Sequence, residues 1–513
     1  MKQKRSLIFF AIVLMFASCE RVEDTTIDDP SDGDFGRNSK NFNVNFQYLN
    51  TIKVGGEGAS EISAYDPKSK KLFIVNVDQN EISVYNISNL NAPVEEAPIA
   101  ISSGAPNSVA VHKGKLAVAV EDEIKQNPGR ILIYDTTTSA LINSFTVGAL
   151  PDMVTFSPNG QFIVSANEGE PNDDYDVDPE GSISIIETVS GQVTTLGFDA
   201  FVSQQAELTA LGFRIFGPNA SLPQDIEPEY VAISDNSNYA WVTLQENNGI
   251  AKVNLQSKVI EAIYPLGFKD FDLPQNSLDA SDRDDIKMLQ NWPVKGIYHP
   301  DAIDYVKIGG RDYLITANEG DARDYDGFSE EERIDDLVLD ATAFPDADFL
   351  QESENLGRLK ITTTLGDVDG DGDYDELYAY GARSFSVWSG NGQLLFDSGN
   401  DIAQQTLNLT PDRFNDDDGR SDDKGAEPES IEILNIQGNK FVMFVGLERN
   451  DQILVYDISN PASPIFLSLL SHEGDEAPEG LLAIPAKDSP NGRDLLVVAN
   501  EDSGTVTIYE NRQ

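Results

Sequence analysis

The chain has 513 residues, of which 40% are hydrophobic, and it carries 87 acidic against 36 basic side chains, for a formal net charge of -51. This acidic excess excludes nucleic acid as a partner, because that binding depends on neutralising phosphates with Lys and Arg. It suits divalent cations, although a soluble, self-repelling surface is the simpler explanation for most of the charge.

The N-terminus reads as a targeting segment. A basic start at Lys2, Lys4 and Arg5 precedes the apolar run Leu7–Phe16, which is too short to span a bilayer. The following Ala-Ser-Cys19 resembles the end of a bacterial lipoprotein signal peptide, although Phe16 stands where that pattern prefers Leu. We therefore predict a signal peptide over 1–18 and a lipid on Cys19, the single cysteine. An ordinary signal peptide cut elsewhere is the alternative.

Residues 19–41 are polar and rich in Asp and Glu, a composition typical of a disordered tether. An acidic stretch after the lipid cysteine also resembles the surface-export signals of some Gram-negative lipoproteins. The predicted location is the outer membrane or cell surface of a Gram-negative type of bacterium, with the lipid on Cys19 as the membrane contact.

From residue 42 to 513 the chain repeats one phrase: an apolar strand ending in Ala-Asn-Glu, a turn, and a second apolar strand. The phrase is clearest at Ile163–Glu168, Leu314–Glu319 and Leu495–Glu501. Units start at a Pro followed by an acid or Asn, and recur every 45 to 70 residues. This pattern predicts an all-β fold, a single β-propeller of four-stranded blades.

Seven blades are favoured and eight are the alternative. The number depends on whether the two units between Pro300 and Phe396 share strands around an insertion or form separate blades. The last unit ends at Tyr509 after three strands. Phe46–Val54 is predicted to supply its fourth strand and close the ring, which removes open sheet edges. Four stretches do not fit the blade pattern and are predicted as loops and small subdomains mounted on one face: about 201–223, 269–295, 325–355 and 399–424.

Strand order predicts where the repeated acids lie. The start of a blade's first, innermost strand and the end of its second strand share one rim. Acids of both kinds should therefore meet near the central channel: Asp152, Glu229, Asp301, Glu429 and Glu479 from first strands, and Glu121, Glu168, Glu246, Glu319, Glu448 and Glu501 from second strands. Such a crown raises pKa values or requires cations, calcium above all. Capping of backbone N–H groups is the structural alternative.

Arg383 stands where other units carry Glu, within Gly381-Ala-Arg-Ser-Phe-Ser386. In an acidic ring, a single cation serves either as a structural counter-ion or as an anchor for an anionic substrate group.

A sharper metal signal lies in Asp367-Val-Asp-Gly-Asp-Gly-Asp-Tyr-Asp-Glu376, where acids alternate with residues that let the backbone curl. It resembles an EF-hand-type loop, but Tyr378 replaces the Glu at the twelfth position. The predicted calcium ligands are Asp367, Asp369, Asp371, Asp373 and Glu376.

Two weaker acidic loops resemble each other. Glu168-Gly-Glu170 continues to Asp174-Tyr-Asp176, and Glu319-Gly-Asp321 continues to Asp324-Tyr-Asp326. The likeness indicates either a duplicated ion-binding loop or two solvated loops.

Catalytic motifs are scarce. Two of the three histidines, His299 and His472, lie near the predicted acidic rim, and two are too few for a confident zinc or iron site. No nucleophile elbow, phosphate loop or dinucleotide glycine pattern is present.

Several segments together resemble the choice-of-anchor I domain family: Leu211–Pro218, Ile226–Tyr230, Thr316–Asp324, the Asp367–Glu376 loop with Arg383-Ser-Phe385, and Gly425–Glu429. The resemblance covers essentially Phe42–Glu510. It implies a secreted or surface-anchored propeller, akin to the mesenchyme-specific cell-surface glycoprotein group and to some atypical alkaline phosphatase-like proteins.

Two functions follow as hypotheses. The first is a calcium-stabilised, monomeric surface module that binds an extracellular ligand, or mediates adhesion, through its acidic face. The alternative is a metal-dependent phosphoester hydrolase, in which cations bind phosphate and activate water. Its candidate catalytic residues are Glu319, Glu168, Arg383 and His299.

Overall fold

The computed structural model describes residues 44–512. The predicted signal peptide, the tether and Cys19 lie outside these residues. No helix in the described part is long and apolar enough to cross a membrane. The prediction of an all-β fold of four-stranded blades is confirmed, since seven of the sheets are antiparallel with four strands each.

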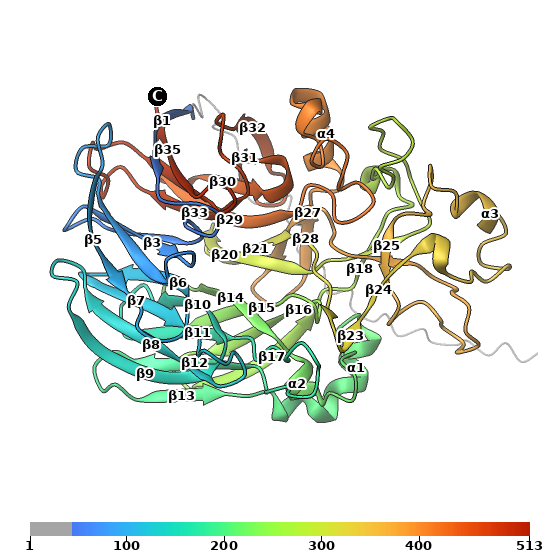
Figure 1. The fold of residues 1–513 in the computed structure, drawn as a ribbon, viewed down its shortest axis with the longest axis horizontal. Coiled ribbons are helices and arrows are strands. Elements are labelled where there is room, and N and C mark those ends of the chain that lie inside the picture. The colour runs from blue at the N-terminus through green and yellow to red at the C-terminus, as the bar shows by residue number, and fades with distance from the viewer. Residues whose placement is uncertain (1–43, 513) are drawn as a thin grey trace, which may run out of the picture.

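The strands of these sheets follow one another in space as in sequence, except where the ring closes (Figure 1). In chain order, the sheets are β2 (Ser63–Asp66), β3 (Lys71–Asn76), β4 (Glu81–Asn86), β5 (Val94–Ala100); β6 (Pro106–His112), β7 (Lys115–Val120), β8 (Pro128–Asp135), β9 (Leu141–Ala149); β10 (Pro151–Phe156), β11 (Phe162–Asn167), β12 (Ser182–Glu187), β13 (Val193–Leu196); β14 (Pro228–Ile233), β15 (Tyr239–Leu244), β16 (Gly249–Asn254), β17 (Val259–Pro265); β20 (Pro300–Ile308), β21 (Arg311–Asn318), β27 (Ser384–Ser389), β28 (Leu394–Asp397); β29 (Pro428–Gln437), β30 (Lys440–Leu447), β31 (Gln452–Asp457), β32 (Ile465–Leu470); and β33 (Pro478–Ile484), β34 (Leu495–Asn500), β35 (Thr505–Asn511) with β1 (Phe46–Lys53).

The ring closes as predicted. β1 pairs antiparallel with β35, so the N-terminal strand completes the sheet that β33, β34 and β35 begin. The two units suspected between Pro300 and Phe396 share one sheet, because β27 and β28 pair onto β20 and β21 after a long insertion.

The hydrophobic core is divided among the contacts between neighbouring sheets. Seven buried clusters each join one four-stranded sheet to the next, and the cluster with Leu72 and Leu495 joins the first to the last. The second strands β3, β11 and β34 are buried along their whole length, which explains their unbroken apolar runs. Sheet packing on both faces therefore fixes the channel and its rim.

The insertions build a structure of their own beside the ring (Figure 1). They hold a five-stranded sheet, a hairpin, four short α-helices and several 3-10 turns: β18 (Phe268–Asp270), β19 (Lys295–Ile297), β24 (Glu331–Arg333), β25 (Lys360–Thr362), β26 (Tyr378–Ala379); β22 (Asp324–Tyr325), β23 (Phe328–Ser329); α1 (Gln205–Ala210), α2 (Leu222–Asp225), α3 (Ala347–Leu350), α4 (Asp401–Leu409); and η2 (Asp199–Gln204), η3 (Pro274–Asn276), η4 (Ile334–Asp336), η5 (Pro411–Arg413), with η6 (Glu448–Asn450) on the rim.

The five-stranded sheet has a separate core that includes Phe271, Trp292, Leu356 and Leu377. Each insertion leaves the ring either after a fourth strand or after a second strand. In these antiparallel sheets both positions lie at the rim where the first strands begin. The insertions therefore flank the predicted acidic rim.

Candidate functional site

The backbone brings the two kinds of rim acid together. In each first strand that starts with Pro, this Pro pairs with the last residue of the second strand, as in Pro151 with Asn167, and the register shifts directly after it. The N–H of Glu168 then donates to the carbonyl of Leu150 at 2.9 Å. A β-bulge of this kind re-aims side chains, here those of the acids after Pro.

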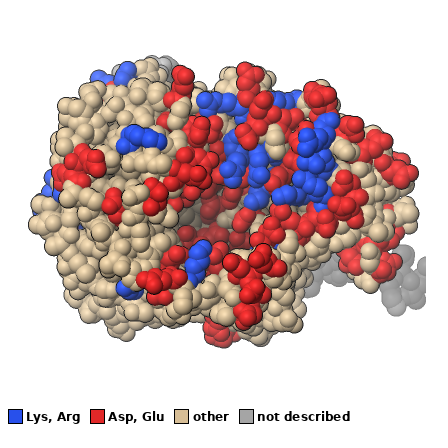
Figure 2. Space-filling view, in the orientation of Figure 1, with Lys and Arg blue, Asp and Glu red and all other residues tan. Residues whose placement is uncertain are grey.

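The acids after Pro line a single cavity of about 180 Å³ in the centre of the ring. Figure 2 shows acidic side chains gathered around a hollow there. Asn107 and Gln245 are among the polar residues that line the cavity. Six carboxylates also line it: Asp152, Glu168, Glu229, Asp301, Glu429 and Glu479. Its lining residues include no Lys, Arg or His. The structure thus gathers all five predicted first-strand acids and one second-strand acid.

The other second-strand acids lie outside this lining: Glu121, Glu246, Glu319, Glu448 and Glu501. Basic side chains compensate some of them. Arg449 forms an ion pair with Glu448 at 2.8 Å. Burial raises the pKa of Glu121, and the charge of Lys125 opposes part of this shift. Glu319 accepts a hydrogen bond from Gln245 at 2.8 Å, and Gln245 itself lines the cavity.

Several carboxylate oxygens here have no hydrogen-bond partner. Oε2 of Glu229, Glu429 and Glu479 is buried and accepts no hydrogen bond, and the same holds for Oε2 of Glu246. A buried carboxylate oxygen without a donor costs free energy unless a proton or a cation compensates it. The protein itself therefore supplies no hydrogen-bond donor to these oxygens.

Burial and mutual repulsion favour the protonated forms. Burial, followed by the charges of Glu170 and Glu121, raises the pKa of Asp152 to about 7. Burial and then Glu501 raise the pKa of Glu61 to about 8, while burial and then Glu448 raise the pKa of Glu429 well above its ordinary value. At neutral pH the cavity therefore either retains protons or binds cations.

A second group of three acids lies at the rim. Oxygens of Glu319, Glu427 and Glu448 come within 4.8 Å of one another. Glu427 is 1% exposed and is already paired with Arg420 at 2.6 Å and with Arg449 at 3.1 Å. These ion pairs satisfy Glu427 without a metal.

The Asp367 loop brings together some, not all, of its predicted ligands. Oxygens of Asp367, Asp369 and Asp375 meet within 4.8 Å, and Asp375 also meets Asp340 and Asp373. Glu376 instead pairs with Lys295 at 2.7 Å, and Asp371 is in neither group. Sequence reasoning missed Asp375, which lies within the motif, and Asp340, which comes from an insertion distant in sequence.

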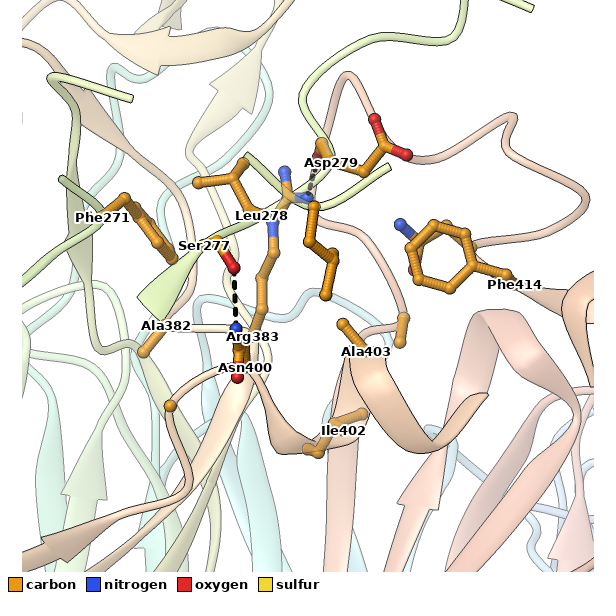
Figure 3. A pocket seen from close by; sticks show the side chains of 14 residues that line it. Phe271, Ser277, Leu278, Asp279, Ala382, Arg383, Asn400, Ile402, Ala403 and Phe414 are labelled. Atoms are coloured by element: carbon orange, nitrogen blue, oxygen red, sulfur yellow. Dashed lines mark hydrogen bonds between the residues drawn. The ribbon is translucent and has the colours of Figure 1, made fainter. Parts of the chain in front are cut away.

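Arg383 lies away from the cavity carboxylates. Its guanidinium donates to backbone carbonyls of Asp279, Ser421 and Asp423 at 2.6 to 3.1 Å. Figure 3 shows it beside Leu278 and Asp279, in a pocket of about 20 Å³ that has room for roughly one water molecule. Arg383 therefore ties two insertions to the ring, and this pocket is too small for a substrate.

His299 is fully buried and does not line the cavity. Its Nδ1 accepts the N–H of Asp321 at 3.2 Å, and its Nε2 lies 3.0 Å from a guanidinium nitrogen of Arg214. Burial, and then Arg214, lower its pKa well below the usual range. Arg214 in turn forms a buried ion pair with Glu330, so His299 belongs to a structural network. His472, partly exposed, stacks on Tyr48.

The Asn of the repeated phrase has a role that sequence reasoning missed. Asn167 donates to the Ser182 carbonyl at 3.0 Å, and Asn318 donates to the hydroxyl of Ser386 at 2.8 Å. The buried Asn thus holds the third strand, while the Glu after it reaches the rim. The recurring Ser and Thr on third strands were the available signal.

Two further acids lie deeper on first strands, four residues after Pro. Asp304 accepts the N–H of Ile433 at 2.9 Å, and Glu432 accepts the N–H of Ala483 at 3.2 Å. Each joins one first strand to the next. The equivalent position in the other units that start with Pro carries an uncharged residue, so the repeat offered no signal for these two acids.

The fold and this rim define a β-propeller with a carboxylate-lined central cavity. The choice-of-anchor I domain matches residues 61–461, and the chain therefore belongs to this family, as its motifs predicted. Membership indicates a protein anchored at the cell surface.

Individual relatives match more partially. The chain is 31% identical to Gigasin-3a of Magallana gigas over 192 residues, 32% of this chain and 67% of that protein. It is 25% identical to the mesenchyme-specific cell surface glycoprotein of Strongylocentrotus purpuratus over 339 residues, 57% of this chain and 41% of the relative. The β-propeller domain of Myceliophteria thermophila Cps50 (Swd1) superposes with a TM-score of 0.45 at 8% identity, over 91% of this chain and 99% of that domain.

Proposed function

We propose that this protein is a cell-surface binding module in which the acidic cavity holds divalent cations, calcium foremost. The observation that carries the proposal is the set of six carboxylates around one cavity, three of which have a buried oxygen without a hydrogen bond. Oxygen-only clusters of this kind match the ligand preference of calcium. A cation bound there is then available to an extracellular ligand that supplies further oxygens.

The predicted lipid on Cys19 would hold the module at the outer membrane or cell surface. The tether over 19–41 would let the acidic face reach a ligand beyond the membrane. Both belong to the proposal.

The Asp367 loop is proposed as a second, structural calcium site. Its Gly370 and Gly372 have φ of 78° and 98°, the left-handed backbone that glycine adopts most readily. They let the oxygens of Asp367, Asp369 and Asp375 converge. The site lies on a surface loop, away from the cavity lining.

The phosphoester hydrolase has less support. The cavity lining contains no Arg, Lys or His to bind a phosphate or move a proton. Arg383, the anion anchor in that hypothesis, bonds backbone carbonyls elsewhere. The geometry therefore favours binding over hydrolysis.

Calcium titration by calorimetry tests the proposal. Chelator-treated protein should bind calcium, and Glu429→Gln with Glu479→Gln should weaken that binding at least tenfold, about 1.4 kcal/mol. These substitutions keep side-chain shape and remove charge. The matched control is Glu95→Gln with Glu207→Gln, two exposed acids. A wild-type protein that binds no calcium would sink the proposal.

A further inference from the structure

The ring has a second face, opposite the acidic rim. Because the strands of each sheet are antiparallel and the first strands begin at the rim, the turns between first and second strands lie on the opposite face, as do those between third and fourth strands. We call these turns, with the strand residue on each side of them, the far face. The turns are 67–70, 87–93, 113–114, 136–140, 157–161, 188–192, 234–238, 255–258, 309–310, 390–393, 438–439, 458–464 and 485–494.

Exposed apolar side chains recur on the far face. Six sheets each place one in the turn between the third and fourth strands, or at the first residue of the fourth strand, and these residues are 40% to 97% exposed. They are Val94, Leu141, Val189, Val259, Leu394 and Ile465. Single exposed apolar residues are ordinary on a protein surface, but these six share one place in the repeat. The far face therefore presents apolar side chains around most of its edge.

The far face also departs from the charge balance of the chain. It holds ten basic and seven acidic residues, whereas the whole chain has 36 basic and 87 acidic ones. The bases are Lys68, Lys70, Lys71, Lys113, Lys115, Lys258, Arg311, Lys440, Lys487 and Arg493, and the acids are Asp66, Asp135, Glu187, Asp235, Asp457, Asp488 and Asp494.

Four of these bases are not neutralised by a contact. Lys258, Lys487 and Arg493 form ion pairs with Glu187, Asp488 and Glu510. In contrast, four exposed bases form no ion pair with any residue that the structure describes: Lys68, Lys113, Lys115 and Arg311. All four lie at turns between first and second strands. The far face can therefore attract an anionic surface, which the acidic rim would repel.

The first described strand, β1, enters the ring on the far face. The carbonyl of Asn45 accepts the N–H of Arg512 at 2.8 Å, and the N–H of Asn511 donates to the carbonyl of Asp494, in a far-face turn, at 2.9 Å. The predicted lipid on Cys19 precedes Val44 by 25 positions. A flexible segment of that length spans about 25 to 30 Å on average, so the anchor would hold the face where it attaches toward the membrane.

We infer that the far face rests on an anionic lipid surface. The apolar side chains at its edge insert among the lipid headgroups, and the unpaired bases face the phosphates. The acidic rim then points away from the membrane, where anionic headgroups do not repel it. This inference deepens the proposed function and rests on its lipid anchor, since it assigns the face of the module that the membrane covers.

The test measures how close each face comes to the lipid, with the full, lipidated chain in vesicles of phosphatidylcholine and phosphatidylglycerol. Cys19 is the single cysteine and would carry the lipid, so an introduced cysteine is the only thiol that a fluorophore can label. Val189→Cys places the label on the far face, and Val177→Cys places it on the rim loop between β11 and β12; both valines are exposed. We expect spin-labelled lipid to quench the label at position 189 at least threefold more strongly than at position 177.

Charge reversal separates attraction to the lipid from tethering alone. Lys113→Glu with Arg311→Glu should reduce the quenching at position 189 at least twofold in these vesicles, without a change in melting temperature. Lys53→Glu with Arg283→Glu, two exposed bases outside the far face, is the matched control and should leave the quenching unchanged.

Three results would overturn the inference: equal quenching at the two positions, stronger quenching at position 177, or charge reversal without effect. Calcium titration of the wild type tests the proposed cation site separately, so the two can fail independently. If mass spectrometry finds no lipid on Cys19, the proposed anchor fails. Flotation of the chain with the same vesicles then tests the far face by itself: flotation supports the inference, and its absence overturns it.

Discussion

The central cavity and the Asp367 loop both concentrate carboxylates, but their oxygens have different surroundings. In the loop, Asp367 already accepts N–H groups of its own backbone, from Gly370 at 2.8 Å and Gly372 at 3.2 Å. In the cavity, Glu429 and Glu479 each have a buried oxygen that accepts nothing. Solvent and salt screen charges on an exposed loop much more than charges in a buried cavity. Substituting carboxylates should therefore change calcium binding and stability modestly in the Asp367 loop and strongly in the central cavity.

Removing charge from the cavity should have the largest effect. In Glu429→Gln with Glu479→Gln, we expect stability without metal to rise by about 1 to 3 kcal/mol at an alkaline pH that ionises these acids in the wild type, since repulsion between buried charges falls. The stabilisation that calcium gives to the wild type should largely disappear. Denaturant unfolding with and without calcium measures both effects, and an unchanged response to calcium would contradict them.

The metal-free protein should lose stability as the pH rises. Burial raises the pKa of Asp152 and Glu246 to about 7 and that of Glu61 to about 8. A carboxyl whose pKa is higher in the folded state stabilises the fold below its unfolded pKa, and this contribution is lost as pH rises through the folded value. We expect a loss of a few kcal/mol between about pH 5 and about pH 8.

Calcium should abolish most of that loss, because it replaces the protons. Calcium binding should accordingly release protons, which calorimetry in buffers of different ionisation enthalpy measures. A metal-free melting temperature that rises over this pH range would refute the assignment.

The loop should respond more weakly. Asp367→Asn with Asp369→Asn should remove one calcium from the bound total and change global stability by less than about 1 kcal/mol. Limited proteolysis near Gly370 should become faster in calcium. Metal analysis of the dialysed variant measures the bound total, and loss of all calcium would show that the two sites are not separate.

A change in ionic strength should have the smallest effect, and this effect is on calcium affinity. Raising the salt concentration should weaken calcium affinity at the loop more than at the cavity, since buried charges are less screened. Titrating the two pairs of variants at low and high salt separates the sites, and equal salt dependence would argue against the difference in burial.

The sequence predicted the features that repeat. The period of the Ala-Asn-Glu phrase indicated the four-stranded unit, and strand order indicated which acids share a rim. It could not give features that depend on distant residues. Asp340 comes near Asp375 only through the folded insertion. Arg383 bonds carbonyls from two insertions that its local motif does not reveal.

The sequence also did not reveal which side chains contact one another around the rim. Gln245 resembles the Asn of the phrase, yet it lines the cavity and contacts Glu319. The tyrosines of the two Asp-Tyr-Asp loops were visible, but their contact depends on the arrangement of two different sheets.

An anomalous-scattering map of crystals grown with calcium tests the central claim most directly. We predict a peak in the central cavity, within coordination distance of Glu429 and Glu479, together with a separate peak at the Asp367 loop. A map with a peak at the loop and none in the cavity would contradict the account.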